Sequence, residues 1–166
     1  CDSNMTHKSE HSAVVLNIRS EEELLDHATT LIHHNPQLLV EEMVADAVCE
    51  LIVGVAHDPC IGPWMMIGSG GVLAELVGDS TVVLVPTNRA ELEAALRSLK
   101  VYPSLTGFRG GPMGDSEALL QVLLAVSDLA LAQRQVLAEL DINPLIVRPR
   151  GRGVVAVDAL LRRVPG

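Results

Sequence analysis

Three oxygen-bearing side chains near the end of the sequence have the types and the spacing to do chemistry. Residues 139–145 read Glu-Leu-Asp-Ile-Asn-Pro-Leu. Because successive side chains of a strand point to opposite faces, Glu139, Asp141 and Asn143 share one face if this segment is extended. A strand here therefore predicts a row of oxygen ligands on one side of a sheet.

A further carboxylate is expected to face this row. Val-Asp-Ala follows at residues 157–159, and a hairpin that turns at the Arg150–Gly151 bond places Asp158 directly opposite Asn143. Opposed side chains on one face lie about 5 Å apart. A carboxylate and an amide oxygen suit Mg²⁺, which takes few protein ligands and completes its shell with water and substrate phosphates. The spacing predicts metal and nucleotide chemistry, and the alternative is a solvated strand that ends at Asn-Pro.

The elements that must position this hairpin are strands in the first half of the chain and at its end, with helices grouped between. Strands are expected over residues 13–18, 38–44, 50–56, 81–85, 136–147 and 153–160, with further apolar runs at 64–67 and 72–77. Helices are expected from a capping box at Ser20 and Glu23 toward His33, from Asn88 through Leu99, and from Asp115 to about Ala132, with a loop over 103–114. This order predicts an α+β fold, with a largely antiparallel sheet covered by helices.

A glycine cluster lies between the two apolar runs. Residues 68–71 read Gly-Ser-Gly-Gly, without the spacing of a dinucleotide-binding fingerprint. The backbone N–H groups of Gly68, Gly70 and Gly71 could approach a phosphate closely, because glycine has no Cβ. The alternative is a tight turn, and the sequence leaves both open.

Composition excludes two classes of protein. The chain has 166 residues, 48% of them hydrophobic, which is enough apolar surface to exclude a disordered tail. Its formal charge is −9 and only 2% of its residues are aromatic, so it lacks both the positive charge and the stacking surfaces of a nucleic-acid-binding protein. We expect no nucleic acid as a partner.

Cysteine usage and the apolar runs indicate the cellular compartment in which the chain is expected. Three cysteines form neither a disulfide framework nor a metal-ligand spacing, so a reducing cytoplasm is expected. Polar residues interrupt every long apolar run, so no membrane span is expected. The chain opens at Cys1 with neither an initiator Met nor a signal peptide, and we expect that it begins partway through a longer protein.

Several motifs together resemble one family. They lie in one order along nearly the whole chain: residues 7–10, 14–17, 40–44, 50–55, 58–59, 62–63, 68–71, 107–110, 139–145 and 157–159. This pattern resembles the ATP-grasp region of ADP-forming acyl-CoA synthetases and, more distantly, the β subunit of succinyl-CoA ligase. The resemblance implies an ATP-grasp fold, in which residues 1–40 end the first lobe and residues 41–166 form the second, metal-binding lobe.

The resemblance implies a role for each matching residue. Asn143 and Asp158 match metal ligands for Mg²⁺, supported by Asp141 and Glu139. Glu41, Glu42, Met43 and Val44 match the segment whose backbone groups bind the adenine of ATP or ADP. Glu50 matches an acid on the ribose or metal side.

The implied reaction is a reversible ligation of an acid to coenzyme A. Acyl-CoA and phosphate give an acyl phosphate, a histidine takes the phosphoryl group, and ADP receives it. His7 matches a candidate phosphohistidine, and Lys8 and Arg109 are candidate phosphate neighbours. Residues 10–13 read Glu-His-Ser-Ala, where the family has an acid and a small-residue pair that ends in glycines.

The resemblance also implies partners. Three parts would lie outside this chain: the first-lobe lysine that binds nucleotide, most of that lobe, and a CoA-binding domain or α subunit. This chain alone should therefore show no catalytic turnover. A homo-oligomer is left open. The alternative function is a regulatory ATP-grasp-like module of a larger protein fused to an acetyltransferase, which binds ligands or partners without catalysis.

Overall fold

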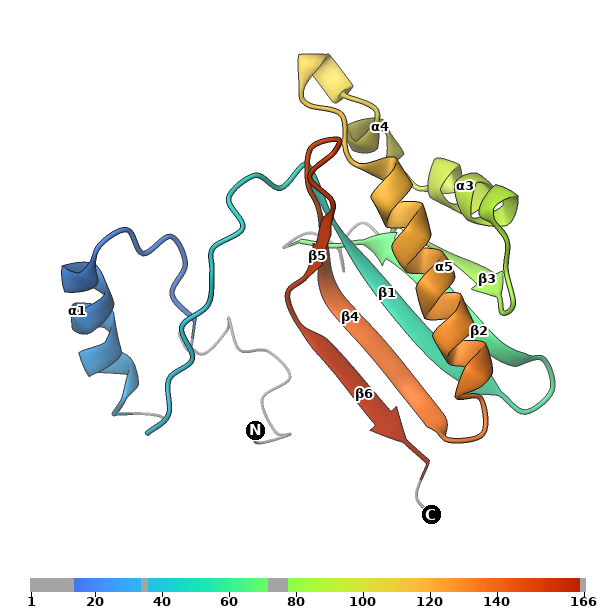
Figure 1. Ribbon diagram of the computed structural model, residues 1–166, viewed down its shortest axis with the longest axis horizontal. Helices are drawn as coiled ribbons and strands as arrows, with labels where there is room; N and C mark the ends of the chain where they lie inside the picture. The colour runs from blue at the N-terminus through green and yellow to red at the C-terminus, as the bar shows by residue number, and fades with distance from the viewer. Residues whose placement is uncertain (1–13, 34–35, 72–77, 165–166) are drawn as a thin grey trace. The chain divides into compact units, whose positions relative to one another are not determined.

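The structure is a computed structural model that describes residues 14–33, 36–71 and 78–164. The chain divides into two compact units between Ala45 and Asp46. The elements in chain order are α1 (Glu21–Leu31), β1 (Cys49–Asp58), β2 (Gly62–Ser69), β3 (Ser80–Leu84), α3 (Arg89–Ser98), α4 (Tyr102–Leu105), the 3₁₀ helix η1 (Phe108–Gly110), α5 (Ser116–Ala132), β4 (Leu137–Val147), β5 (Val154–Ala156) and β6 (Ala159–Arg163) (Figure 1).

The first unit contains one described helix, and half of its predicted capping box is formed. The hydroxyl of Ser20 accepts a hydrogen bond from the N–H of Glu23 at 3.1 Å. The Glu23 carboxylate in turn accepts from the N–H of Arg19 at 2.8 Å, one residue before the expected donor. The Ser20 hydroxyl therefore satisfies one N–H group that the first turn leaves without a helical partner, and Glu23 binds the chain just before the helix.

The two strands expected in this unit are not formed. Residues 14–19 and 37–45 have no regular secondary structure, and most of their side chains are exposed. A β-branched run needs a neighbouring strand for its N–H and C=O groups, and no described segment of this unit pairs with either run. Both strand predictions were therefore wrong, because an apolar pattern without a partner strand does not make a strand.

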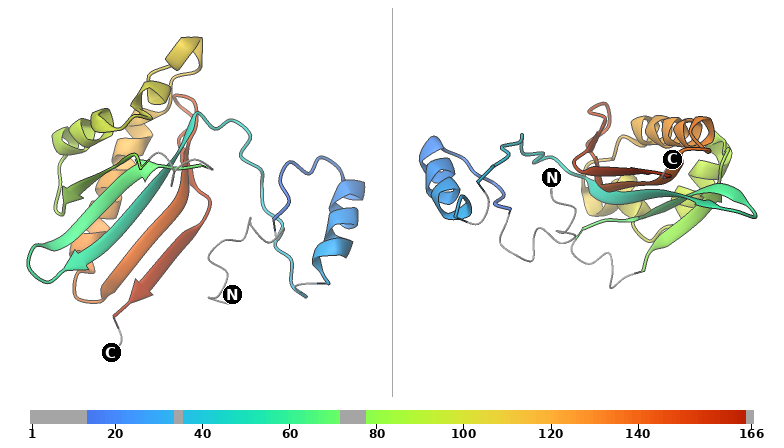
Figure 2. Two further views of the ribbon diagram at one scale, coloured as in Figure 1. Left: turned by 180° about the vertical axis from the view of Figure 1, so that it is seen from behind. Right: turned by 90° about the horizontal axis from the view of Figure 1, so that it is seen from below.

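The second unit is built on an antiparallel sheet, as predicted. The strand order is β3-β2-β1-β4-β5, and β6 follows β5 along the same edge of β4. Consecutive strands that pair at close range form the hairpins β1–β2 and β4–β5 (Figures 1 and 2). The strand expected over residues 153–160 is divided into β5 and β6 at Val157 and Asp158. The apolar run at 72–77 lies outside the described residues.

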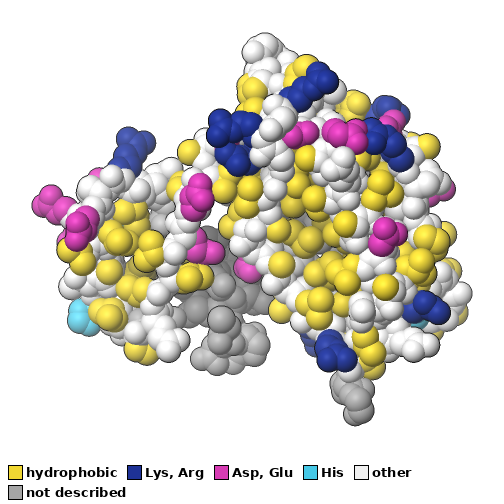
Figure 3. Space-filling model, viewed as in Figure 1, with side chains coloured by type: hydrophobic (Ala, Val, Ile, Leu, Met, Phe, Trp, Pro, Cys, Tyr) yellow, Lys and Arg dark blue, Asp and Glu magenta, His cyan; other side chains and the backbone are white. Residues whose placement is uncertain are grey.

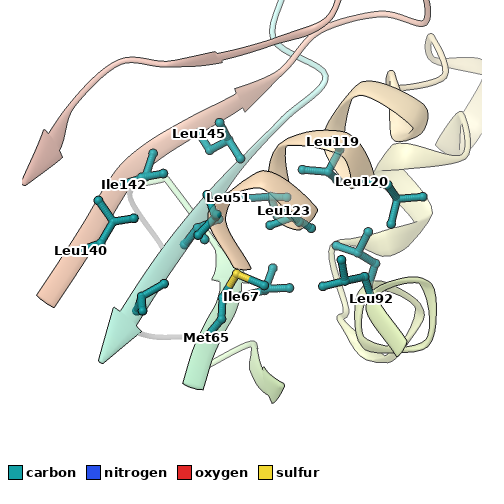
Figure 4. Close-up of a cluster of buried hydrophobic side chains, with 14 of the residues drawn as sticks. Leu51, Met65, Ile67, Leu92, Leu119, Leu120, Leu123, Leu140, Ile142 and Leu145 are labelled. Carbon is teal, nitrogen blue, oxygen red and sulfur yellow. The ribbon is translucent and has the colours of Figure 1, made fainter. Parts of the chain in front are cut away.

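Helices α3 and α5 cover one face of this sheet, and the core lies between the helices and the sheet. Asn88 caps α3 with a complete capping box and Asp115 caps α5, both as predicted. Figure 4 shows strand side chains directed toward those of the helices. The largest fully buried side chains of this core include Leu51, Met65, Ile67, Leu92, Leu105, Leu119, Leu123 and Leu145. The loop expected over 103–114 is wrong in part, because most of α4 and all of η1 fall within it.

Strand β4 contains a bulge at the point where the hairpin chemistry was expected. Leu51 of β1 pairs with Leu145, but Val53 pairs with Ile142, so two residues of β4 oppose one residue of β1. One of these is Pro144, which has no N–H to donate. The bulge lets Ile142 and Leu145 both face the core while Asn143 is exposed. No described helix is long and apolar enough to cross a membrane.

Candidate functional site

The register of the β4–β5 hairpin is the one predicted from the sequence. Leu145 pairs with Ala156, and on the far side of the break Ile142 pairs with Ala159. Between these pairs, the N–H of Asn143 donates a hydrogen bond to the carbonyl oxygen of Asp158 at 3.0 Å. The two residues therefore lie opposite each other across the hairpin.

The polar residues of this hairpin gather on the face of the sheet turned away from α3 and α5. Asp141 is half-buried there, opposite Gly54 of β1. Partial burial raises the pKa of Asp141, and the negative charges of Glu139 and Asp158 raise it further. The Asp158 carboxylate therefore lies near enough to Asp141 for its charge to disfavour ionisation.

Glu139 has a second partner on this face. Its carboxylate pairs with the guanidinium of Arg162 on β6 at 3.1 Å, and both side chains are largely exposed. Among the described residues, no group of three or more His, Cys, Asp or Glu side chains lies together closely enough to hold a metal. The backbone pairing sets Asn143 opposite Asp158, the charge of Asp158 acts on Asp141, and Glu139 is paired with Arg162.

Glu50 lies at the start of β1, against the glycine cluster. The N–H of Gly70 donates to the carbonyl oxygen of Glu50 at 2.8 Å, and a Cβ at Gly70 would lie 3.1 Å from backbone and side-chain atoms of Glu50. A Cβ at Gly71, where φ is +87°, would lie 3.6 Å from Oε2 of Glu50. Two glycines therefore let the chain pass closely over this half-buried acid.

The same hydrogen bonds limit the phosphate-binding role proposed for the glycine cluster. Ser69 donates its N–H to the carbonyl oxygen of Asp79 at 2.8 Å, and the Gly70 N–H is used by Glu50. A Cβ at Gly68 would lie 3.2 Å from the Asp79 carbonyl oxygen. Close packing of backbones accounts for Gly68 and Gly70, which favours the turn that the sequence left as the alternative.

The segment expected to bind adenine belongs to the first unit. Residues 41–44 form neither helix nor strand; Glu41, Glu42 and Met43 are exposed and Val44 is half-buried. Their backbone groups lie outside the hydrogen-bond ladder of the sheet. His7 and Lys8 lie outside the described residues.

Arg109 lies on η1, in the loop that follows α4. Its backbone is left-handed, with φ of 53°, and its guanidinium stacks over the ring of Phe108 at 5.1 Å from the centroid. Both side chains are exposed. In Figures 1 and 2 this segment projects past the end of the sheet rather than over its face.

Sequence reasoning missed an ion-pair cluster at the start of the second unit. Asp46 accepts two hydrogen bonds from Arg148, at 2.8 and 3.0 Å, and Arg152 contributes a third contact at 3.2 Å. The Arg148 hydrogen bonds hold the pKa of Asp46 below its usual range. A usable signal was present, because three arginines within residues 148–152 concentrate positive charge that attracts carboxylates in an acidic chain.

A second role of Asp115 was also missed. Beyond capping α5 through the N–H of Ala118, its carboxylate accepts from the N–H groups of Gly151 at 2.9 Å and Gly153 at 2.8 Å. The hydrogen bonds from Gly153 and Ala118 lower the pKa of Asp115. One buried carboxylate therefore fixes the β4–β5 turn to the start of α5. Its position as an N-cap gave no indication of the second contact.

The chain is similar in sequence to known proteins of one family. The family profile described as an ATP-grasp domain matches residues 1–162. The chain is 35% identical to the β subunit of ADP-forming acetate–CoA ligase II from Pyrococcus furiosus, over 92% of this chain and 68% of that protein. It is 37% identical to ADP-forming acetate–CoA ligase I from Archaeoglobus fulgidus, over 91% of this chain and 23% of that protein.

A solved structure agrees in fold. The acetyl-coenzyme A synthetase 1 of Ca. Korarchaeum cryptofilum, in complex with coenzyme A and Mg-AMPPCP, matches with a TM-score of 0.84 and 34% identity, over 99% of this chain and 74% of that one. The chain spans about a quarter of the longer ligases it matches and about two thirds of the β subunit. The profile, the sequence relatives and the structure agree, and the chain belongs to the ATP-grasp family, in the group that includes the β subunits of ADP-forming acetate–CoA ligases.

Proposed function

We propose that this chain is the nucleotide-binding part of an ADP-forming acid–CoA ligase, in which it passes phosphate between ATP or ADP and a phosphohistidine. The observation that carries the proposal is the hairpin register that sets Asn143 opposite Asp158. Support comes from the relatives, which are named as ligases of acetate and other acids. The Korarchaeum synthetase is in complex with coenzyme A and Mg-AMPPCP, and its phosphohistidine segment points towards the nucleotide binding site.

In this proposal Mg²⁺ binds between Asn143 and Asp158. The side chains fit a hard cation, because they offer an amide oxygen and a carboxylate and leave room in the shell for water and phosphate. The raised pKa of Asp141 supports the site, since a dication there would relieve repulsion among the carboxylates on this face. When bound, the ion would cancel charge on the transferred phosphoryl group. Asp141 and Glu139 act as supporting acids and orient the shell.

The nucleotide base is proposed to bind the segment at the end of the first unit. Residues 41–44 would offer backbone groups to adenine, and Glu50 would lie on the ribose or metal side. Support comes from the backbone of residues 41–44, which is not used in helix or strand, and from the glycines that keep the Glu50 carboxylate uncovered by a Cβ. Residues 1–40 would complete the first lobe and residues 41–166 would form the second.

The phosphate end of the site is proposed to involve His7 and Lys8. His7 would accept and return the phosphoryl group, and Lys8 would neutralise its charge. Arg109 is a further candidate cation, which would have to reach the phosphate from the exposed loop after α4. Gly68, Gly70 and Gly71 would border the site, with Gly70 shaping the turn rather than donating to phosphate.

The remaining machinery is proposed to lie in other parts of the ligase. The relatives are up to about four times longer than this chain or are subunits of an assembly, which supports a first ATP-grasp lobe and a CoA-binding domain or α subunit as partners. A second copy of the chain is a further candidate. We place the ligase in the cytoplasm, in keeping with the free thiols of Cys49 and Cys60.

Transfer of the γ-phosphate of labelled ATP tests the function. We expect the complete ligase to acquire an acid-labile label on histidine and, with coenzyme A and a short carboxylic acid, to release ADP and phosphate. His7→Ala should remove the label, and His11→Ala is the matched control. A regulatory module would bind nucleotide without label or turnover, and release of AMP and pyrophosphate would equally contradict the proposal.

A further inference from the structure

The loop of residues 107–113, here called the Phe108 loop, exposes apolar side chains that the fold does not use. Phe108 is one of only three aromatic residues in the chain and is 57% exposed. Met113 at the other end of the loop is 51% exposed. Burial of such a side chain is worth about 1.5–3 kcal/mol, so leaving both in water forgoes stability that this chain could have gained.

The backbone of the Phe108 loop holds these side chains outward. Within it, Gly110 donates to the Gly107 carbonyl oxygen at 3.3 Å and Gly111 to that of Phe108 at 3.1 Å. Gly107 has a φ of +87°, and a Cβ there would lie 3.1 Å from the Gly111 carbonyl oxygen. The loop is therefore compact and hydrogen-bonded, and it presents Phe108 in a fixed setting.

Positive charge flanks this apolar surface. The guanidinium of Arg109 stacks on the Phe108 ring, and the N–H of Arg150 in the β4–β5 turn donates to the Met113 carbonyl oxygen at 2.8 Å. Arg150 is exposed, and its turn is pinned by the Asp115 carboxylate. Figure 3 shows dark-blue side chains over η1 and over this turn, in a chain whose formal charge is −9.

Building on the proposed function, we propose that the Phe108 loop docks into an apolar pocket edged by carboxylates on the CoA-binding part of the same ligase. Aromatic, methionine and arginine side chains at the centre of a rigid patch are typical of the residues that dominate binding energy. Carboxylates around the pocket would match Arg150. The relatives are long enough to contain such a partner, because about three quarters of the single-chain ligases lie outside the matched region.

A second copy of the chain fits this surface less well. Most homodimers are isologous, so the same patch would face itself across a twofold axis. That contact would bring Arg150 of one copy toward Arg150 of the other, and like charges at an interface cost several kcal/mol. The charge pattern therefore favours a different polypeptide surface.

Titration of the CoA-binding subunit or domain against the ATP-grasp polypeptide, followed by calorimetry, tests the docking. We expect Phe108→Ser and Met113→Ser each to weaken binding roughly ten-fold or more. Arg150→Glu should weaken it several-fold and reduce its salt dependence. The matched controls are Ile61→Ser, at a position 60% exposed in the β1–β2 turn, and Arg134→Glu, exposed after α5. Neither should change the affinity.

The outcomes separate this inference from the proposed function. MgADP binding by the Met113→Ser polypeptide should equal that of the wild type, and its thermal unfolding should stay cooperative. If Phe108→Ser and Met113→Ser bind the CoA-binding part as tightly as the wild type, the docking is wrong while histidine labelling still stands. If the variants instead abolish self-association of the polypeptide in sedimentation, the occupant is a second copy and the inference is equally overturned.

Discussion

The two faces of strand β4 differ in what their side chains do. Leu140, Ile142 and Leu145 are nearly fully buried against the helical layer. Glu139 and Asp141 lie on the other face, where Asp141 is half-buried among negative charges. One strand thus supplies packing on one side and the proposed metal chemistry on the other, and changes on one face should leave the property of the other intact.

The bulge shows how closely the two faces depend on register. If β4 ran through Asn143 and Pro144 without a bulge, strict alternation from Ile142 would turn Leu145 away from the core. With it, the pairing of β4 to β5 and β6 continues in one register while the pairing to β1 shifts by one. Side chains before and after the bulge therefore keep to the same two faces. The proposed metal ligand Asn143 lies at the bulge itself.

Loss of the proposed metal ligand should give the largest effect on function. Asp158→Ala is expected to lower phosphoryl transfer in the complete ligase about 1,000-fold, equivalent to about 4 kcal/mol of barrier. Asn143→Ala should act in the same direction, because both oxygens serve one ion. Quench-flow measurement of histidine labelling gives the rate, and thermal unfolding should change little. Normal transfer in both variants would remove the metal assignment and erase the functional difference between the faces.

Truncation on the packed face should do the reverse. Leu51→Ala removes a side chain that is 0% exposed and is expected to lower the free energy of unfolding by about 3 kcal/mol. Val82→Ala, at a position 57% exposed on the other face, serves as the control and should stay within about 0.5 kcal/mol. Urea unfolding measures both. Equal losses would show that the second face also carries the stability of the sheet.

The β4–β5 turn connects the packed layer to the proposed site, and Asp115 is its anchor. Asp115→Ala removes three hydrogen bonds and is expected to lower Tm by several degrees, since the N–H groups of Gly151 and Gly153 lose their acceptor. A lowered pKa means that this stabilisation is present at neutral pH and is lost as pH falls through the folded-state value. The Tm difference from wild type should therefore shrink in acid. Asp128→Ala, exposed on the same helix, is the control.

The sequence allowed the second unit to be predicted better than the first. Residues 80–84, 88–98 and 137–147 carried local signals that agree with their tertiary setting: a β-branched run, an N-cap residue and alternation. Residues 14–18 and 38–44 carried a similar apolar signal without a partner strand, so propensity alone gave wrong strands.

The candidate site was predictable where it depends on register and hidden where it depends on contacts between distant segments. Counting from the Arg150–Gly151 turn gave the Asn143–Asp158 pairing, because antiparallel register follows from turn position. The pairing of Asp46 with Arg148 joins residues 102 positions apart, and no periodicity encodes such a contact. The use of the Gly70 N–H by Glu50 is likewise a product of the fold.

Removal of the excess charge at Asp141 should give the smallest effect and the sharpest test of how the faces differ. A raised folded-state pKa means that wild-type stability falls as pH rises from below the ordinary aspartate value of about 3.9 through the folded-state value. Asp141→Asn abolishes that loss and should stabilise the metal-free protein at neutral pH by about 0.5 kcal/mol after solvent screening. Mg²⁺ should stabilise the wild type more than the variant, because the ion relieves repulsion that Asn lacks. Urea unfolding across pH with and without Mg²⁺ measures this, and a destabilised Asn variant would mean that Asp141 packs the sheet rather than carrying repelled charge.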